Sequence, residues 1–201
     1  MKQLLPVSGL LLVVAGLFFF PMASCSQSSV AGAVNEAIVK YDNDGDGGSF
    51  YAGGGITTYQ TGVRLTSTEI GSYTDGDIVQ VRISVDLVPD SMKLSLYSDN
   101  YNNTTSQYEP FTLLYSQTVN GLVAKSWNDI KLSTPYTLTG SNVWVVLEIF
   151  SSVSTNPIMK NDTGPVNSRG DWYRGYSSGA WNQWAHISFN KNLHIRTIIH
   201  Y

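Results

Sequence analysis

The chain has 201 residues, of which 42% are hydrophobic and 13% charged, and its net charge at pH 7 is −3. This length suits one domain with a substantial core. The weakly acidic balance weighs against nucleic acid as a partner, because phosphate binding requires a concentrated basic surface. Since Cys25 is the only cysteine, an intrachain disulfide is excluded.

The first 24 residues predict an export signal. Lys2 gives a positive start, an apolar stretch runs from about Leu10 to Phe20, and the small residues Ala23 and Ser24 follow. The apolar stretch is too short to favour a membrane span. We therefore expect residues 1–24 to be a signal peptide, residues 25–35 a flexible tether of small and polar residues, and residues 36–201 the folded domain.

The residues that end at Cys25 resemble a bacterial lipobox, with Met22 where the family usually has leucine. The resemblance implies that Cys25 is lipidated and becomes the new N-terminus after cleavage. We then expect an exported lipoprotein in the periplasm or at the cell surface, attached to the membrane only through its lipid. The alternative is an ordinary signal peptide, cut near Ser24, that leaves an unmodified thiol.

Strand patterns dominate the rest of the chain. Apolar and polar residues alternate from Val79 to Leu87, which predicts that Ile83 points inward and Ser84 outward. Val143 to Phe150 is apolar on both faces apart from Glu148, which predicts a central strand covered on each side. Further strands are expected at 37–41, 57–65, 92–96, 111–119, 127–132, 171–176 and 193–201.

Turn residues separate these strands, as at Asp75-Gly76 and Asn120-Gly121, and no segment after the signal has a helical stripe. Many short strands without intervening helices predict an all-β fold, an antiparallel β-sandwich of jelly-roll type.

Structural Trp, Gly and Pro positions across residues 36–201 resemble the non-catalytic jelly-roll modules of secreted bacterial peptidases and surface proteins. The residues that carry the resemblance are Tyr41-Asp42-Asn43-Asp44-Gly45, Trp127, Pro135, Leu138-Thr139-Gly140, Trp144, Gly164-Pro165, Gly170-Asp171-Trp172 and Ile195-Arg196. The resemblance implies a fold rather than an activity.

Asp42, Asp44 and Asp46 form the pattern D-x-D-x-D-G, which is typical of the start of a calcium loop. The twelfth position of an EF-hand loop would be Gly53 instead of glutamate, so the pattern is not an EF-hand. We expect a different Ca²⁺ site, completed by carbonyl oxygens or by a distant carboxylate such as Glu69 or Asp162. The alternative is a solvated acidic turn.

The segment from Trp172 to Trp184 is rich in aromatic residues and glycines. Trp172, Tyr176, Trp181 and Trp184 predict a platform on which sugar rings stack, or else rings that pack in the core. Gly175-Tyr176-Ser177-Ser178-Gly179 matches G-x-S-x-G, but no acidic residue follows Ser177, so a hydrolase triad is not expected. His194 and His200 are expected at the surface.

We therefore expect a non-catalytic binding module whose partner is a glycan or a cell-surface protein. Carbohydrate is the favoured ligand. The first alternative is a structural or adhesion module that binds protein, and the second is a sandwich-fold, glycan-active enzyme.

Overall fold

The computed structural model describes residues 34–50, 57–152, 158–175, 179–184 and 189–201. Val34–Tyr201 forms one compact unit. The expected signal peptide, Cys25, Tyr176 and Ser177 lie outside the described residues. In the described part, no helix has the length and apolar character needed to cross a membrane.

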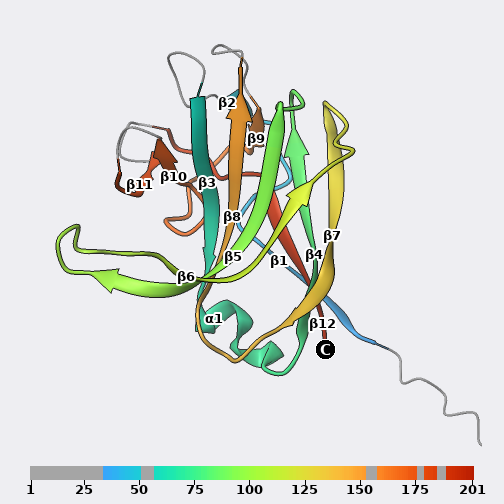
Figure 1. Ribbon diagram of the computed structural model, residues 1–201, viewed down its shortest axis with the longest axis vertical. Coiled ribbons are helices and arrows are strands. Elements are labelled where there is room, and N and C mark those ends of the chain that lie inside the picture. Colours follow the sequence, from blue (N-terminus) through green and yellow to red (C-terminus); the bar gives the residue numbers. More distant parts are fainter. Residues whose placement is uncertain (1–33, 51–56, 153–157, 176–178, 185–188) are drawn as a thin grey trace, which may run out of the picture. The chain divides into compact units, whose positions relative to one another are not determined.

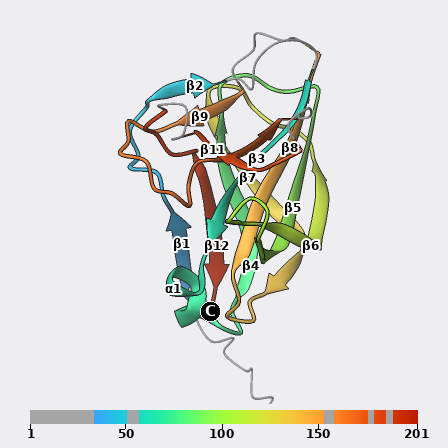
Figure 2. The ribbon, with the colours of Figure 1, turned by 90° about the vertical axis from the view of Figure 1, so that its left-hand side faces the viewer.

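The fold is an all-β sandwich of two antiparallel sheets, as predicted (Figure 1). Sheet A contains β1 (Glu36–Lys40), β2 (Gly48–Phe50), β4 (Asp77–Val85), β7 (Ser126–Thr137), β9 (Met159–Asn161) and β12 (Ile195–His200). Sheet B contains β3 (Thr57–Leu65), β5 (Ser91–Asn102), β6 (Gln107–Val119), β8 (Val143–Ser151), β10 (Trp172–Gly175) and β11 (Asn182–Gln183). The turned view separates the two layers (Figure 2).

The main hydrophobic core fills the space between the sheets. Sheet A contributes Ile83 and Ile195 among others, and sheet B contributes Leu94, Val145 and Leu147, all of which are buried. These residues alternate along their strands with residues on the outer faces, as a pleated strand requires.

Strand β8 is central in sheet B, between β3 and β5, and its burial confirms the two-sided pattern. Its inward side chains join the main core. On the outer face, Trp144 and Val146 are buried in a second cluster with Trp172 and Trp181, against which Tyr97 packs. We call these five residues the outer aromatic cluster.

The alternation in β4 is only partly as predicted. Val81, Ile83 and Val85 are buried, but a register irregularity between Ile78 and Gln80 makes Ile78 the buried residue at the start of the strand. Val79 is only half-buried. Ser84, which alternates with Ile83 and Val85, is buried as well, and this corrects its expected exposure to solvent.

Two features of the fold were not predicted from the alternation of apolar and polar residues. A short helix, α1 (Ser67–Ile70), is followed by the 3₁₀ turn η1 (Gly71–Tyr73). A capping box between Thr66 and Glu69 begins α1. The other feature is the hairpin that joins β5 to β6, which projects to the left of the sheet in Figure 1. We call the part from Asp99 to Pro110 the arm.

Candidate functional site

The aromatic residues expected to form a sugar platform pack inside the protein. Trp172, Trp181 and Trp184 are only 6%, 3% and 6% exposed. Trp144 meets Trp172 edge-on, with ring centroids 5.1 Å apart, and Trp181 lies 5.8 Å from the same ring. Trp184 belongs to the main core and stacks on Tyr173. Rings this deeply buried cannot form a broad stacking platform, so of the two arrangements expected for these tryptophans the structure supports packing.

Asp99 joins the outer aromatic cluster to the base of the arm. Its carboxylate accepts a hydrogen bond from Trp144 Nε1 at 2.8 Å and one from Asn142 Nδ2 at 2.7 Å. Arg64 of β3 binds the same carboxylate through Nε and Nη2, the latter at 2.6 Å. This two-point geometry fixes the guanidinium as well as neutralising it.

The guanidinium of Arg64 in turn supports the arm, because its Cζ lies 3.9 Å from the ring centroid of Tyr108. Tyr101, opposite Tyr108 in the hairpin, meets that ring edge-on at 5.2 Å. Tyr101 is 46% exposed and Tyr108 is 43% exposed. The arm therefore presents an ordered pair of exposed aromatic rings.

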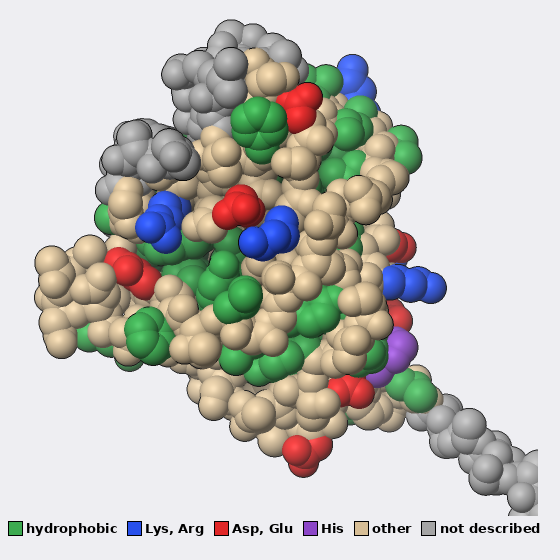
Figure 3. Space-filling model, in the orientation of Figure 1, with side chains coloured by type: hydrophobic (Ala, Val, Ile, Leu, Met, Phe, Trp, Pro, Cys, Tyr) green, Lys and Arg blue, Asp and Glu red, His purple; other side chains and the backbone are tan. Residues whose placement is uncertain are grey.

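A groove of about 590 Å³ lies beside this pair and is called the arm groove. Its lining contains hydroxyl and amide side chains from the arm, from the segment before β10 and from β11. The lining residues are Arg64, Thr66, Tyr101, Thr105, Ser106, Gln107, Tyr108, Ser168, Arg169, Trp172 and Gln183. Figure 3 shows hydrophobic side chains gathered between the arm and the body of the sheet.

Polar contacts hold the arm in place. Gln107 Nε2 donates to the backbone oxygen of Trp181, which links the arm to the segment covering the outer cluster. Glu109 accepts hydrogen bonds from Thr105, Asn102 and Gln107. Burial alone would raise the pKa of Glu109, but these bonds lower it below its ordinary value, so the carboxylate is charged at neutral pH.

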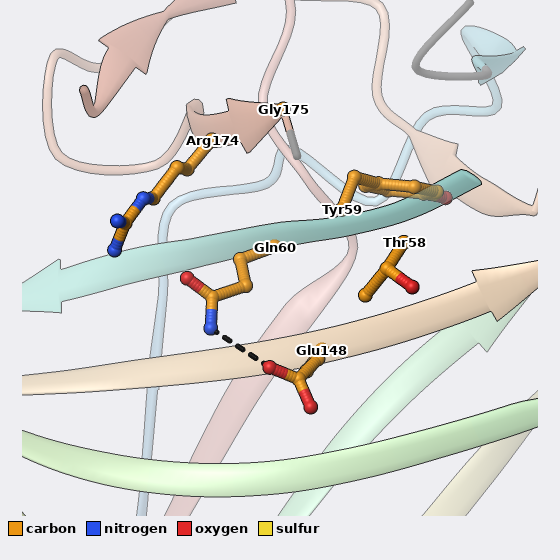
Figure 4. Close-up of a pocket in the computed structure, with 6 residues that line it drawn as sticks. All are labelled: Thr58, Tyr59, Gln60, Glu148, Arg174 and Gly175. Carbon is orange, nitrogen blue, oxygen red and sulfur yellow. Dashed lines mark hydrogen bonds between the residues drawn. The ribbon is translucent and has the colours of Figure 1, made fainter. Parts of the chain in front are cut away.

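A smaller hollow of about 320 Å³ lies on the same sheet. Gln60 of β3 and Glu148 of β8 point toward one another, and Gln60 Nε2 donates to Glu148 at 3.1 Å (Figure 4). Arg174 extends from β10 beside them, and Glu148 also lies 3.9 Å from Lys93. This hollow is polar and lacks the exposed aromatic pair of the arm groove.

The three aspartates of the expected calcium loop each have a basic partner. Asp42 is buried and binds Arg196, and Asp44 binds both Arg196 and Lys40. Asp46 lies 2.7 Å from Lys160. The Lys40 ammonium lowers the pKa of Asp44, and the Lys160 ammonium lowers that of Asp46.

Asp162, named as a distant candidate ligand, does lie beside this loop, because its carboxylate accepts a hydrogen bond from the backbone nitrogen of Asn43. Glu69 instead pairs with Arg169. Within the part of the chain that the structure describes, no three His, Cys, Asp or Glu side chains converge in a group that could hold a metal ion. Calcium binding at Asp42, Asp44 and Asp46 stays a prediction, and it requires the cation to compete with internal ion pairs.

The histidines behave differently from one another. His200 is partly exposed, whereas His194 is buried, which corrects its expected surface position. The His194 ring stacks on Trp127 at 4.9 Å, and its Nε2 lies 3.0 Å from the Gly45 carbonyl oxygen. A carbonyl only accepts, so Nε2 carries the proton, and Nδ1 is buried without a partner. Burial lowers the pKa of His194 more than the nearby Asp42 raises it.

Sequence reasoning missed the arm groove, although Tyr101 and Tyr108 flank a turn-rich polar stretch that could have indicated a hairpin tip. No family model matches the chain, and no curated protein matches it.

Proposed function

We propose that the protein is an exported, lipid-anchored, non-catalytic binding module that holds carbohydrate in the arm groove. The observation that carries the proposal is the exposed pair Tyr101 and Tyr108 beside a groove lined with hydroxyl and amide groups. Flat aromatic faces suit the C–H faces of sugar rings, and planar amides suit their hydroxyl groups.

The geometry also supports a binding role for Tyr108 in particular. Arg64 occupies one side of its ring and is itself fixed by Asp99, so the ring is positioned before any ligand arrives. Preorganisation of this kind lowers the entropic cost of binding. The arm is held at Trp181 as well, which limits the rearrangement that binding would require.

A protein partner is the second candidate, favoured by exposed apolar side chains on β6. Phe111 is 67% exposed, and Leu113 and Leu114 are exposed beside it. Exposed apolar patches on a protein surface often mark contacts with another protein. These residues follow the arm and do not line the arm groove, so the two candidates can be separated by mutation.

The test measures binding of the purified protein to a panel of immobilised glycans and compares Tyr108→Ala with Phe111→Ala. Carbohydrate binding in the arm groove predicts that Tyr108→Ala weakens binding by about two- to twelvefold, since stacking on an aromatic ring contributes on the order of 0.5–1.5 kcal/mol. Phe111→Ala should bind as the wild type does. Binding to no glycan, or binding that Phe111→Ala weakens and Tyr108→Ala leaves unchanged, would contradict the proposal.

The anchor has its own test. Mass spectrometry of the native protein should find a diacylated Cys25 at the N-terminus, and Cys25→Ala should release a soluble form or block processing. Two or more acyl chains are expected, because a single chain gives only marginal membrane attachment. An unmodified thiol at Cys25 would refute lipidation and leave the binding site unaffected.

A further inference from the structure

The charged side chains around the arm groove are paired within the protein. Arg64 is bound by Asp99, and Arg169 Nη1 lies 2.6 Å from Glu69 Oε1. These arginines are the only cationic side chains that line the groove among the described residues. The charge of each arginine is therefore offset by an internal carboxylate.

Glu109, in the arm, carries a further negative charge beside the lining residue Gln107. Thr105, Asn102 and Gln107 satisfy its oxygens, and Arg174 attracts it electrostatically. The two arginines that line the groove are thus each balanced by a carboxylate, Arg64 by Asp99 and Arg169 by Glu69.

From this balance we infer that the arm groove selects uncharged glycans and rejects acidic ones such as uronate-containing polysaccharides. The inference rests on the proposed function and adds the ligand class. An acidic sugar must lose part of its hydration on entering the groove, and it finds no unpaired cation there in return. A neutral sugar incurs no such cost, because its hydroxyl groups exchange hydrogen bonds with water for hydrogen bonds with side-chain amides and hydroxyls.

Glu69 offers the sharpest test of this inference. Its side chain accepts the hydrogen bond from the Thr66 backbone nitrogen that begins α1, and glutamine at this position retains that acceptor. Glu69→Gln therefore keeps the helix cap and removes the charge that neutralises Arg169. The variant should leave Arg169, whose side chain is 34% exposed, free to bind a carboxylate.

The experiment measures binding of wild-type protein and Glu69→Gln to one neutral and one uronate-containing polysaccharide, at low and high salt. Wild type should bind only the neutral polymer, with little dependence on salt. Glu69→Gln should bind the acidic polymer about tenfold tighter than wild type does, since a hydrogen bond to a charged group contributes on that order, and salt should weaken the gain.

Two further variants serve as controls. Asp129→Asn removes the partner of Arg82, which is exposed to nearly the same degree at 35% but belongs to sheet A, so it should gain no acidic binding. Adding Arg169→Gln to Glu69→Gln should reverse the gain. A melting curve of Glu69→Gln close to that of wild type establishes that the variant is folded.

The outcomes separate this inference from the proposed function. If wild type binds the acidic polymer with salt dependence and Tyr108→Ala abolishes that binding, the groove is a glycan site and the selection of neutral ligands is refuted. Selection of neutral ligands is refuted as well if Glu69→Gln gains no more acidic binding than Asp129→Asn. If Tyr108→Ala changes binding to neither polymer, the proposed function itself fails.

Discussion

Trp181→Ala tests whether the aromatic segment is packing or platform. The indole is 3% exposed and lies against Trp144 in the outer aromatic cluster. Truncating a buried tryptophan removes its transfer free energy and leaves a cavity, at a cost of about 3–5 kcal/mol. In a domain of this size each kcal/mol lowers Tm by about 2–4 °C. We therefore expect Tm to fall by roughly 6–20 °C.

Differential scanning calorimetry measures this change, and Tyr108→Ala is the matched control. Tyr108 is 43% exposed, and its substitution removes contacts with Arg64 and with the Tyr101 ring. Such a cation–π contact contributes about 1 kcal/mol or less at an exposed site. If Trp181→Ala melted like wild type, or lost less stability than Tyr108→Ala, the ring would be a surface residue and our assignment of it to packing would be refuted.

Three other predictions concern the core, the buried histidine and the acidic loop. Ile83→Asp should prevent folding, because it places an unpaired carboxylate between the sheets. The control Thr118→Asp, at an exposed position on β6, should change the free energy of unfolding by no more than about 0.5 kcal/mol. Equal effects of the two substitutions in urea unfolding would show that the inward face of β4 is misassigned. Because the pKa of His194 is lowered in the folded protein, the unfolded chain takes up the proton first as pH falls, so this contribution to stability is present above pH ~6.5 and is lost below it. His194→Gln should therefore flatten the dependence of Tm on pH between about 7 and 5. An unchanged slope would show that His194 is not its cause. Calcium binding predicts that a roughly tenfold excess of Ca²⁺ over Kd raises the free energy of unfolding by about 1.4 kcal/mol, and that Asp44→Ala abolishes this gain. Identical melting curves with calcium and with chelator would leave the loop aspartates as ion-pair partners alone.

The strands could be predicted well where the residues on both faces of a strand follow a clear apolar or polar pattern. The expected range 57–65 coincides with β3, and the double-sided apolar pattern of Val143 to Phe150 identified the central strand of sheet B. Alternation of apolar and polar residues shows which side chains share one face of a strand, so it indicates the strand even when the sheet that packs against it is unknown. It cannot tell which outer face is covered by a loop, and for that reason the choice between packing and platform for Trp172 and Trp181 is left open by the sequence alone.

The arm escaped prediction for a related reason. Strands were expected at 92–96 and 111–119, but β5 continues to Asn102 and β6 begins at Gln107. The intervening residues are polar and rich in Asn and Thr, which is typical of a loop. Local hairpin pairing orders this stretch, together with contacts to Arg64 and to the Trp181 carbonyl, which are distant in the sequence.

Pairing of β1 with β12 has a consequence for when the protein can fold. Glu36 pairs with His200 and Lys40 with Arg196, so the first strand gains its neighbour only after the last strand has been synthesised. Until then β1 has no sheet to join, and β4 lacks the partner that β12 supplies. Contacts between residues so distant in the sequence form slowly, because a long loop must close before they are made. The nascent chain is thus kept from completing sheet A until β12 has been synthesised.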